Sequence, residues 1–119
     1  MSNTFFGLSV DCDDAATLAR FWADVLGREV AADPDSDNAV VTVDAVGVHG
    51  PRLAFHRVPE PKTVKNRLHL DLVTAEFDAE TERLLGLGAT RIRDVAENGA
   101  NWTTFADIEG NEFDVIAAA

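Results

Sequence analysis

The order of predicted elements repeats once along the chain, and this repeat constrains the fold more than any single element. Two helices are predicted, at Ala15–Leu26 and Glu76–Leu87, and a glycine follows each of them, Gly27 and Gly88. Glycine is the residue that most often ends a helix. Each helix has one predicted strand before it and three after it. The sequence therefore predicts two copies of a β-α-β-β-β module.

The strands are predicted from short runs of β-branched and aromatic residues that turn residues bound on each side. They are Phe5–Cys12, Arg28–Ala32, Ala39–Val46 and Arg52–Val58 in the first half, and Arg67–Thr74, Ala89–Asp94, Trp102–Ala106 and Glu112–Ala117 in the second. The stretch 59–66, PEPKTVKN, carries two prolines and two lysines, which predicts an exposed connector. We expect one domain, with module one at 1–58, the connector at 59–66 and module two at 67–119.

Apolar residues at helical spacing mark the buried side of each predicted helix. They are Leu18, Phe21, Trp22, Val25 and Leu26 in the first helix, and Phe77, Leu84, Leu85 and Leu87 in the second. Asp13 or Asp14 is placed to cap the first helix. Each half alone is too small to bury a core well. We therefore predict an α+β fold in which the modules form a curved, partly closed mixed sheet, with helices outside and a cleft inside.

Composition excludes several classes of protein. The formal net charge of −11 argues against binding to nucleic acids or anionic membranes, and it favours a cationic ligand. No apolar run has the length of a membrane span, and the N-terminus lacks the pattern of a secretion signal. Cys12 is the single cysteine, so no internal disulfide forms; we expect it to be buried and inert. A cytoplasmic protein is the expectation.

Polar residues alternate with apolar ones in two predicted strands of the second half. In Arg67–Val73, the side chains of Arg67, His69 and Asp71 share one face, and leucines occupy the other. In Glu112–Ile116, Phe113 and Val115 pack, which leaves Asp114 on the opposite face. We expect His69 and Asp114 to meet in a cavity. Arg67 and Asp71 either pair with each other, or the Arg67 guanidinium binds an anionic group of a substrate.

Other polar and aromatic residues allow two readings each. Trp102 either stacks on a flat ligand or only packs, whereas Trp22 belongs to the core. The acids Asp33, Asp35, Asp37 and Asp44 have the spacing of a calcium loop, but Asn38 occupies the position that requires glycine. Solvated loop acids are therefore the prediction, and His49, in a turn, is also expected to be solvated.

Five stretches together resemble a known superfamily, in the same order along the chain. They are Leu18–Val30, Leu53–Lys62, Lys65–Leu72, Leu84–Asp94 and Ala106–Ile116. The chain resembles the vicinal oxygen chelate superfamily, which includes glyoxalase I, extradiol dioxygenases, fosfomycin-resistance enzymes and bleomycin-binding proteins. Within it, the chain is most similar to small bacterial glyoxalase-like domains.

The resemblance implies paired βαβββ modules around a cleft and, in the enzymes, a divalent metal on four ligands from four strands. It puts ligands of the second module at His69 and Asp114. The matching positions of the first module are Gly7 and Ala54, whose side chains bind no metal. His56 is two residues further on and faces the same side as Ala54, so a shifted register or a bulge would let it substitute as a ligand. Zinc, nickel, manganese or iron would suit these donors. The two lost ligands favour a polar cluster without a metal.

Two functions follow as expectations from this reading. The first is the binding of a small organic molecule in the cleft, with an incomplete or absent metal site, as in the drug-sequestering relatives. The alternative is a metal-dependent lyase, isomerase or dioxygenase that uses His69, Asp114 and His56. The expected ligand-binding residues are His56, Arg67, His69, Asp71, Trp102 and Asp114. The resemblance also implies a homodimer, because short chains of the superfamily commonly build the cleft from two subunits.

Overall fold

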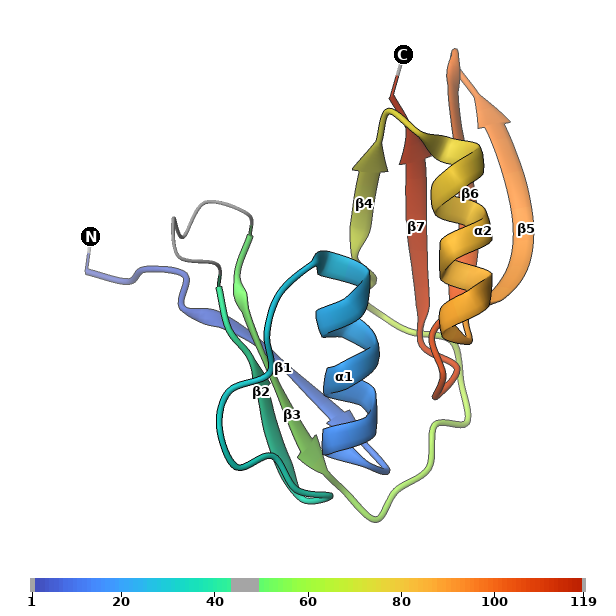
Figure 1. Ribbon diagram of the computed structural model, residues 1–119. Helices are drawn as coiled ribbons and strands as arrows, with labels where there is room; N and C mark the ends of the chain where they lie inside the picture. Colours follow the sequence, from blue (N-terminus) through green and yellow to red (C-terminus); the bar gives the residue numbers. More distant parts are fainter. Residues whose placement is uncertain (1, 44–49, 119) are drawn as a thin grey trace. The chain divides into compact units, whose positions relative to one another are not determined.

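The computed structural model describes residues 2–43 and 50–118. Within it the chain divides into two compact units, Met1–Pro61 (unit 1) and Lys62–Ala119 (unit 2), whose elements are labelled in Figure 1. The predictions for Asp44 and His49 fall outside the described residues. Each unit combines a helix with a mixed sheet, which confirms the predicted α+β class. The full β-α-β-β-β order is present in unit 2, whereas unit 1 has one strand fewer.

In unit 1, one face of a helix packs against one sheet. Its elements are β1 (Gly7–Cys12), α1 (Ala15–Leu26), β2 (Asn38–Val41) and β3 (Arg52–Arg57). The strand order is β1-β3-β2, with β1 parallel and β2 antiparallel to β3. Helix α1 begins as predicted, because the Asp14 side chain accepts a hydrogen bond of 3.1 Å from the backbone N–H of Thr17. It ends at Gly27, whose φ of 66° lies in the left-handed region that favours glycine.

The strand predicted at Arg28–Ala32 is wrong as a full strand. It is reduced to a single bridge between Val30 and Val41, with backbone hydrogen bonds of 2.8 Å from Ala31 to Val40 and 3.0 Å from Thr42 to Glu29. The chain turns away directly afterwards, because Asp33 adopts a positive φ of 62°. The extended stretch is therefore too short for a ladder.

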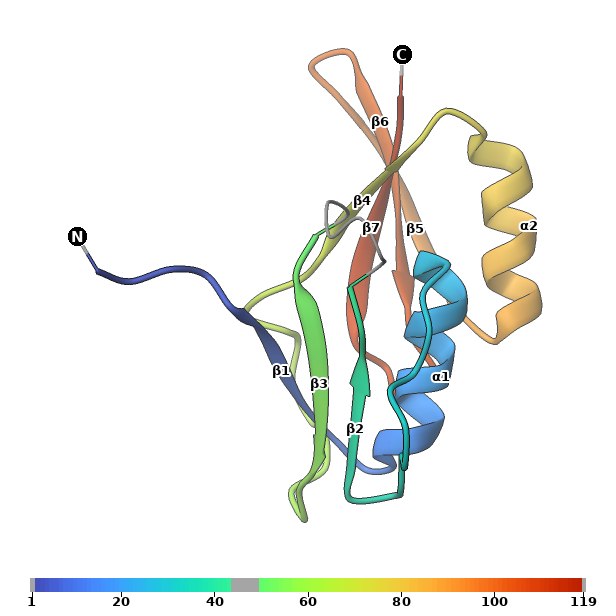
Figure 2. The same cartoon turned by 60° about the vertical axis from the view of Figure 1, so that its left-hand side comes forward.

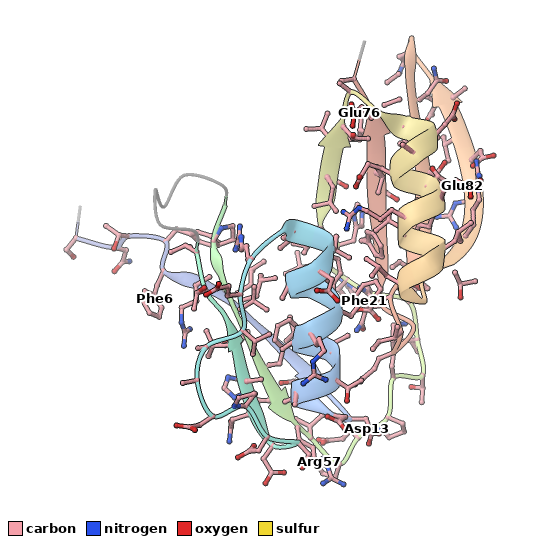
Figure 3. The ribbon with its side chains drawn as sticks, viewed as in Figure 1. Phe6, Asp13, Phe21, Arg57, Glu76 and Glu82 are labelled. Atoms are coloured by element: carbon pink, nitrogen blue, oxygen red, sulfur yellow. The ribbon has the colours of Figure 1, made fainter. Side chains whose placement is uncertain are left out.

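The core of unit 1 lies between α1 and its sheet. Leu18 of the helix and Phe55 of β3 are fully buried, and the rings of Phe21 and Trp22 meet edge to face at 5.6 Å between centroids. Cys12 is buried, as predicted. Ahead of β1, Phe6 projects from the chain as an exposed side chain (Figure 3), and the Arg52 guanidinium lies 5.0 Å from its ring centroid.

Unit 2 has the same design with a larger sheet. Its elements are β4 (Asp71–Thr74), α2 (Phe77–Leu87), β5 (Thr90–Glu97), β6 (Ala100–Ala106) and β7 (Glu112–Ala117). The strand order is β4-β7-β6-β5, in which only the pair β4 and β7 is parallel. Helix α2 covers one face of this sheet, as Figure 2 shows. Among the described residues, neither helix has the length and apolar character that crossing a bilayer requires.

Two details of unit 2 differ from the predictions. The strand expected from Arg67 begins only at Asp71, and Leu68, on the leucine face of that predicted strand, is 82% exposed. The chain approaches β7 differently there, because Asn66 bonds to Glu112 through its backbone and its side chain. In α2, Leu85 is 43% exposed whereas Thr81 is buried. The buried side of the helix is therefore the one that carries Thr81 and Leu84.

The core of unit 2 forms beneath α2. Phe105 of β6 and Phe113 of β7 are directly paired in the antiparallel ladder, and their rings stack with 5.7 Å between centroids. Leu84 of α2 and Val115 of β7 are also buried. Because successive strand residues point to opposite faces, the remaining residues of β7 lie on the face that α2 does not cover.

Candidate functional site

Four polar side chains form one row across the helix-free face of unit 2. Asp114 of β7 is the register partner of Asp71 in the parallel pair and of Thr104 in the antiparallel pair. Thr104 is in turn the partner of Arg93. Register partners on neighbouring strands point to the same face. We call Asp71, Asp114, Thr104 and Arg93 the polar row.

An apolar row lies two residues further along the same strands. It consists of Val73, Ile116, Trp102 and Val95, which are register partners in that order. Val73 is 69% exposed, and the other three are half-buried. The face opposite α2 therefore presents hydrocarbon and an indole ring beside two carboxylates. Trp102, a predicted site residue, belongs to this surface.

His69 joins the polar row at its β4 edge. Its Nδ1 lies 3.1 Å from an Asp71 oxygen and 3.7 Å from an Asp114 oxygen. The Thr104 hydroxyl donates a hydrogen bond of 2.6 Å to the other oxygen of Asp114, which holds that carboxylate in place. We call His69, Asp71 and Asp114 the His69 cluster. The structure thus brings together three of the residues that the sequence singled out.

The electrostatics of the His69 cluster favour a cation. Two carboxylates face one imidazole, so the cluster is anionic whether His69 is neutral or protonated. Asp114 is the better shielded carboxylate, with 16% of its side chain exposed against 55% for Asp71. Shielding from water strengthens the attraction between Asp114 and a bound positive charge. The Thr104 hydroxyl leaves the second oxygen of Asp114 available.

The donor atoms of the His69 cluster also fit a divalent metal. One ligand atom from each residue can be chosen so that all three lie within 4.8 Å of one another. Imidazole nitrogen and carboxylate oxygen are ligands of zinc, manganese and iron. His69, Asp71 and Asp114 are the residues that would hold such an ion. Asp71 enters this set in addition to the two ligands that the resemblance implied.

Unit 1 supplies no side-chain donor at the two positions that match metal ligands of the superfamily. Gly7 has no side chain, and a Cβ built on it would lie 2.7 Å from the backbone oxygen of Arg52. Ala54 is buried in the central strand of its sheet. His56 is exposed and lies on the same face of β3 as Ala54, where its Nδ1 is 3.0 Å from the Asn38 side-chain oxygen.

We expect Gly7→His to destabilise the protein rather than restore a ligand. The added Cβ meets a backbone oxygen, which moves only if β1 and β3 separate, so a loss of about 1–3 kcal/mol in the free energy of unfolding is expected. Urea unfolding measures this loss. Gly86→His is the matched control, because no atom lies within 4 Å of a Cβ at that position. Equal stability of the two variants would show that the close approach at Gly7 is not tight.

Arg67, the remaining predicted residue of unit 2, and Thr104, which was not predicted, complete the account of the site. Arg67 is exposed and precedes β4, and Asp71 pairs with His69. Sequence reasoning missed Thr104, although one signal was present. The strands Trp102–Ala106 and Glu112–Ala117 flank a short turn, and pairing them as a hairpin places Thr104 opposite Asp114.

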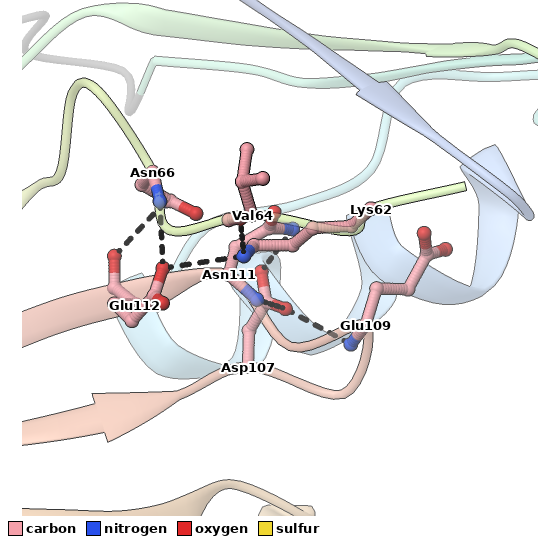
Figure 4. A network of polar contacts seen from close by, with 7 residues as sticks. All are labelled: Lys62, Val64, Asn66, Asp107, Glu109, Asn111 and Glu112. Atoms are coloured by element: carbon pink, nitrogen blue, oxygen red, sulfur yellow. Dashed lines mark hydrogen bonds and ion pairs between the residues drawn. The ribbon is translucent and has the colours of Figure 1, made fainter. Parts of the chain in front are cut away.

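A second polar network ties the beginning of unit 2 to β7 (Figure 4). Glu112 accepts a hydrogen bond of 3.2 Å from the Asn66 backbone N–H, and its carboxylate lies 3.6 Å from the Lys62 ammonium. Burial by itself favours the neutral, protonated form of the Glu112 carboxyl group and so raises its pKa. The backbone N–H groups of Glu112 and Asn66, together with the Lys62 charge, outweigh burial and lower the pKa of Glu112 below its ordinary value of 4.5.

The lowered pKa of Glu112 predicts a pH-dependent contribution to stability. A carboxylate with a depressed folded-state pKa stabilises the fold above its unfolded pKa, and the contribution is lost as the pH falls through the folded-state pKa. We therefore expect Glu112→Gln to melt at a lower temperature than the wild type at neutral pH. The difference should shrink once the pH falls below about 4.5. Melting curves across this range test it, with the exposed Glu82→Gln as control; a difference independent of pH would contradict the expectation.

Comparisons with known proteins agree with this architecture. The family model described as "Glyoxalase-like domain" matches residues 7–116. No curated protein matches the chain. A mutant of the fosfomycin resistance protein FosX from Listeria monocytogenes, solved with Mn(II) and 1S,2S-dihydroxypropylphosphonic acid, has a TM-score of 0.78 and 15% identity, covering 100% of this chain and 93% of that one.

Two other solved structures are similar over the full length of the chain. FosX from Mesorhizobium loti has a TM-score of 0.73 and 14% identity, over 100% of this chain and 95% of that one. Oxidase ChaP-H2 has a TM-score of 0.71 and 21% identity, over 100% and 96%. Identities this low show the shared fold alone. The match to the family model extends over nearly the whole chain, and the protein therefore belongs to the glyoxalase-like domain family of the vicinal oxygen chelate superfamily.

Proposed function

We propose that this protein binds a small organic molecule with a cationic group, and that binding requires no metal. The observation that carries the proposal is the pairing of Asp71 and Asp114 as register partners beside His69 on the helix-free face of unit 2. Two adjacent carboxylates accept charge-assisted hydrogen bonds from one ammonium or amidinium group. The net charge of −11 attracts such a ligand from solution.

The apolar row supports a ligand with a hydrocarbon or aromatic body. Each residue of this row lies two positions from a residue of the polar row on the same strand. The pairs include Val73 with Asp71, Ile116 with Asp114, and Trp102 with Thr104. Burial of apolar surface supplies the driving force, and the carboxylates orient the charged end. The other predicted ligand-binding residues are Arg67 in unit 2 and His56 in unit 1, and their part in binding stays a prediction.

The homodimer implied by the resemblance is part of this proposal. Leu68 and Val73 are large apolar side chains of unit 2 that are mostly exposed, and Phe5 and Phe6 are their counterparts in unit 1. A partner subunit would cover such surface favourably.

A matched pair of ligands tests the proposal. We expect benzylammonium to bind the full chain in a calorimetric titration, and benzyl alcohol, its neutral counterpart of similar shape, to bind at least about tenfold more weakly, because it lacks the charge that the carboxylates attract. The effect should weaken as salt is added. Equal affinity for the two probes, or no binding of benzylammonium, would refute a cation-selective site.

The second candidate is a metal-dependent lyase, isomerase or dioxygenase of the same superfamily. It is favoured by the three donor atoms within 4.8 Å in the His69 cluster. A bound divalent metal would supply Lewis-acid polarisation of a carbonyl or enolate oxygen. Elemental analysis of the purified protein, followed by Mn(II) titration of the wild type and His69→Ala, separates the candidates. Stoichiometric metal that is lost with His69 would favour the enzyme, and absence of metal under every loading condition would exclude it.

A further inference from the structure

A hollow with a volume of about 450 Å³ opens on unit 2 near the beginning of β7. Its walls come from three parts of the unit: the first residues after Pro61, strand β5, and the β6–β7 turn with the start of β7. Its charged lining residues are Lys62, Lys65, Arg93, Glu109 and Glu112. All of them belong to unit 2.

The charges of this hollow differ from those of the whole chain. The chain has a formal net charge of −11, whereas the hollow gathers one more cation than it has carboxylates. Glu112 is already engaged, because the Asn66 N–H and the Lys62 ammonium neutralise and bind its carboxylate. Lys65 and Arg93 are exposed, and within the described part of the chain the side chain of neither forms an ion pair or a hydrogen bond. Their positive charges are therefore available to a ligand.

The walls that carry these cations are held by hydrogen bonds. The Lys62 ammonium donates a hydrogen bond to the carbonyl oxygen of Val64, and Asn66 bonds to Glu112, so the backbone on either side of Lys65 is held in place (Figure 4). On the opposite wall, the Asp107 carboxylate accepts bonds from the backbone N–H groups of Glu109 at 2.9 Å and Asn111 at 3.0 Å. Arg93 lies in the β5–β6 ladder. Little conformational entropy of the backbone would therefore be lost when a ligand binds this site.

We propose that the hollow binds a small oxyanion, a carboxylate or a phosphoryl group. The planar guanidinium of Arg93 can bind two oxygens of such a group, and the Lys65 ammonium adds a point charge. Thr63 contributes a hydroxyl donor to the lining, and Val64 and Ile92 present apolar side chains for a short hydrocarbon part. The site goes beyond the proposed cation site, since none of its lining residues belongs to the His69 cluster.

The test uses inorganic phosphate and propionate as probes at constant ionic strength. We expect saturable shifts of the backbone amide NMR signals of residues 62–65, 92–93 and 109–110 with either anion. Arg93→Gln should weaken binding by about tenfold, the effect of one charge-assisted hydrogen bond, and Lys65→Gln/Arg93→Gln should abolish saturation. Arg20→Gln, the same change at an exposed position of α1, is the matched control and should retain wild-type affinity.

Several outcomes would overturn this site. They are the absence of saturable shifts with both anions, equal affinities of Arg93→Gln and Arg20→Gln, and shifts centred outside the lining residues. The Asp71→Asn/Asp114→Asn variant separates this proposal from the proposed function. It should lose benzylammonium binding and keep phosphate binding, so that either site can fail without the other. Loss of phosphate binding in that variant would overturn the assignment of the anion to the hollow.

Discussion

Phe105→Ala is expected to lower the free energy of unfolding by about 3–5 kcal/mol, the largest effect that any single substitution discussed for this protein should have. Phe105 is fully buried and stacks on Phe113 with 5.7 Å between ring centroids. Truncation removes the transfer free energy of the ring and leaves a cavity between α2 and the sheet. Because β6 is an inner strand of the sheet order β4-β7-β6-β5, the surrounding backbone has little freedom to fill it.

Denaturant unfolding followed by circular dichroism measures this loss. Val64→Ala is the control, because that side chain is 74% exposed and its truncation should change stability by no more than about 0.5 kcal/mol. If the variant proves too unstable to purify, Phe105→Leu gives a smaller loss in the same direction. Wild-type stability of either Phe105 variant would show that the aromatic pair is not the centre of the unit 2 core.

Asp71→Asn/Asp114→Asn is expected to weaken benzylammonium binding by about a hundredfold. Each substitution keeps the shape of the side chain and removes one negative charge beside His69. A hydrogen bond to a charged group contributes about 1.5–3 kcal/mol, and each 1.4 kcal/mol corresponds to about a tenfold change in affinity. Asp114→Asn alone should account for the larger part, because Asp114 is the more shielded of the two.

Calorimetric titration of wild type and variants measures this change. Asp78→Asn/Glu82→Gln makes the same change in net charge on exposed positions of α2 and should bind like the wild type. A similar loss in both double variants would mean that overall charge, and not the His69 cluster, attracts the cation. A variant that binds as the wild type does would refute the site. Thermal melting confirms that each variant is folded.

Much of the local structure was predictable from neighbouring residues. The spacing of Leu18, Phe21 and Val25 and the capping residues Asp14 and Gly27 place α1 at its observed bounds. These signals act within one or two helical turns, so they survive without knowledge of the rest of the chain. The buried pair Phe113 and Val115 likewise follows from alternation along one strand. Alternation then places Asp114 on the opposite face.

The extent of the edge segments was not predictable in the same way. Arg67–Leu70 has the alternation of a strand, yet β4 begins at Asp71, because Asn66 and Glu112 hold the preceding chain in another course. Arg28–Ala32 similarly contributes only the bridge at Val30. Edge segments depend on one neighbouring strand for their hydrogen bonds, so intrinsic preference decides little there.

By itself the sequence determined the α+β class, both helices with the glycines that end them, and the polarity of His69, Asp71 and Asp114. Only the tertiary structure decided that Thr104 and Arg93 continue the row of Asp71 and Asp114, and that Lys65 lines one hollow with Arg93. The physical reason is the distance in sequence over which each signal acts. Caps and periodicity depend on residues a few positions apart, whereas register joins strands that are distant in sequence, and a slip of one residue would turn every side chain to the other face.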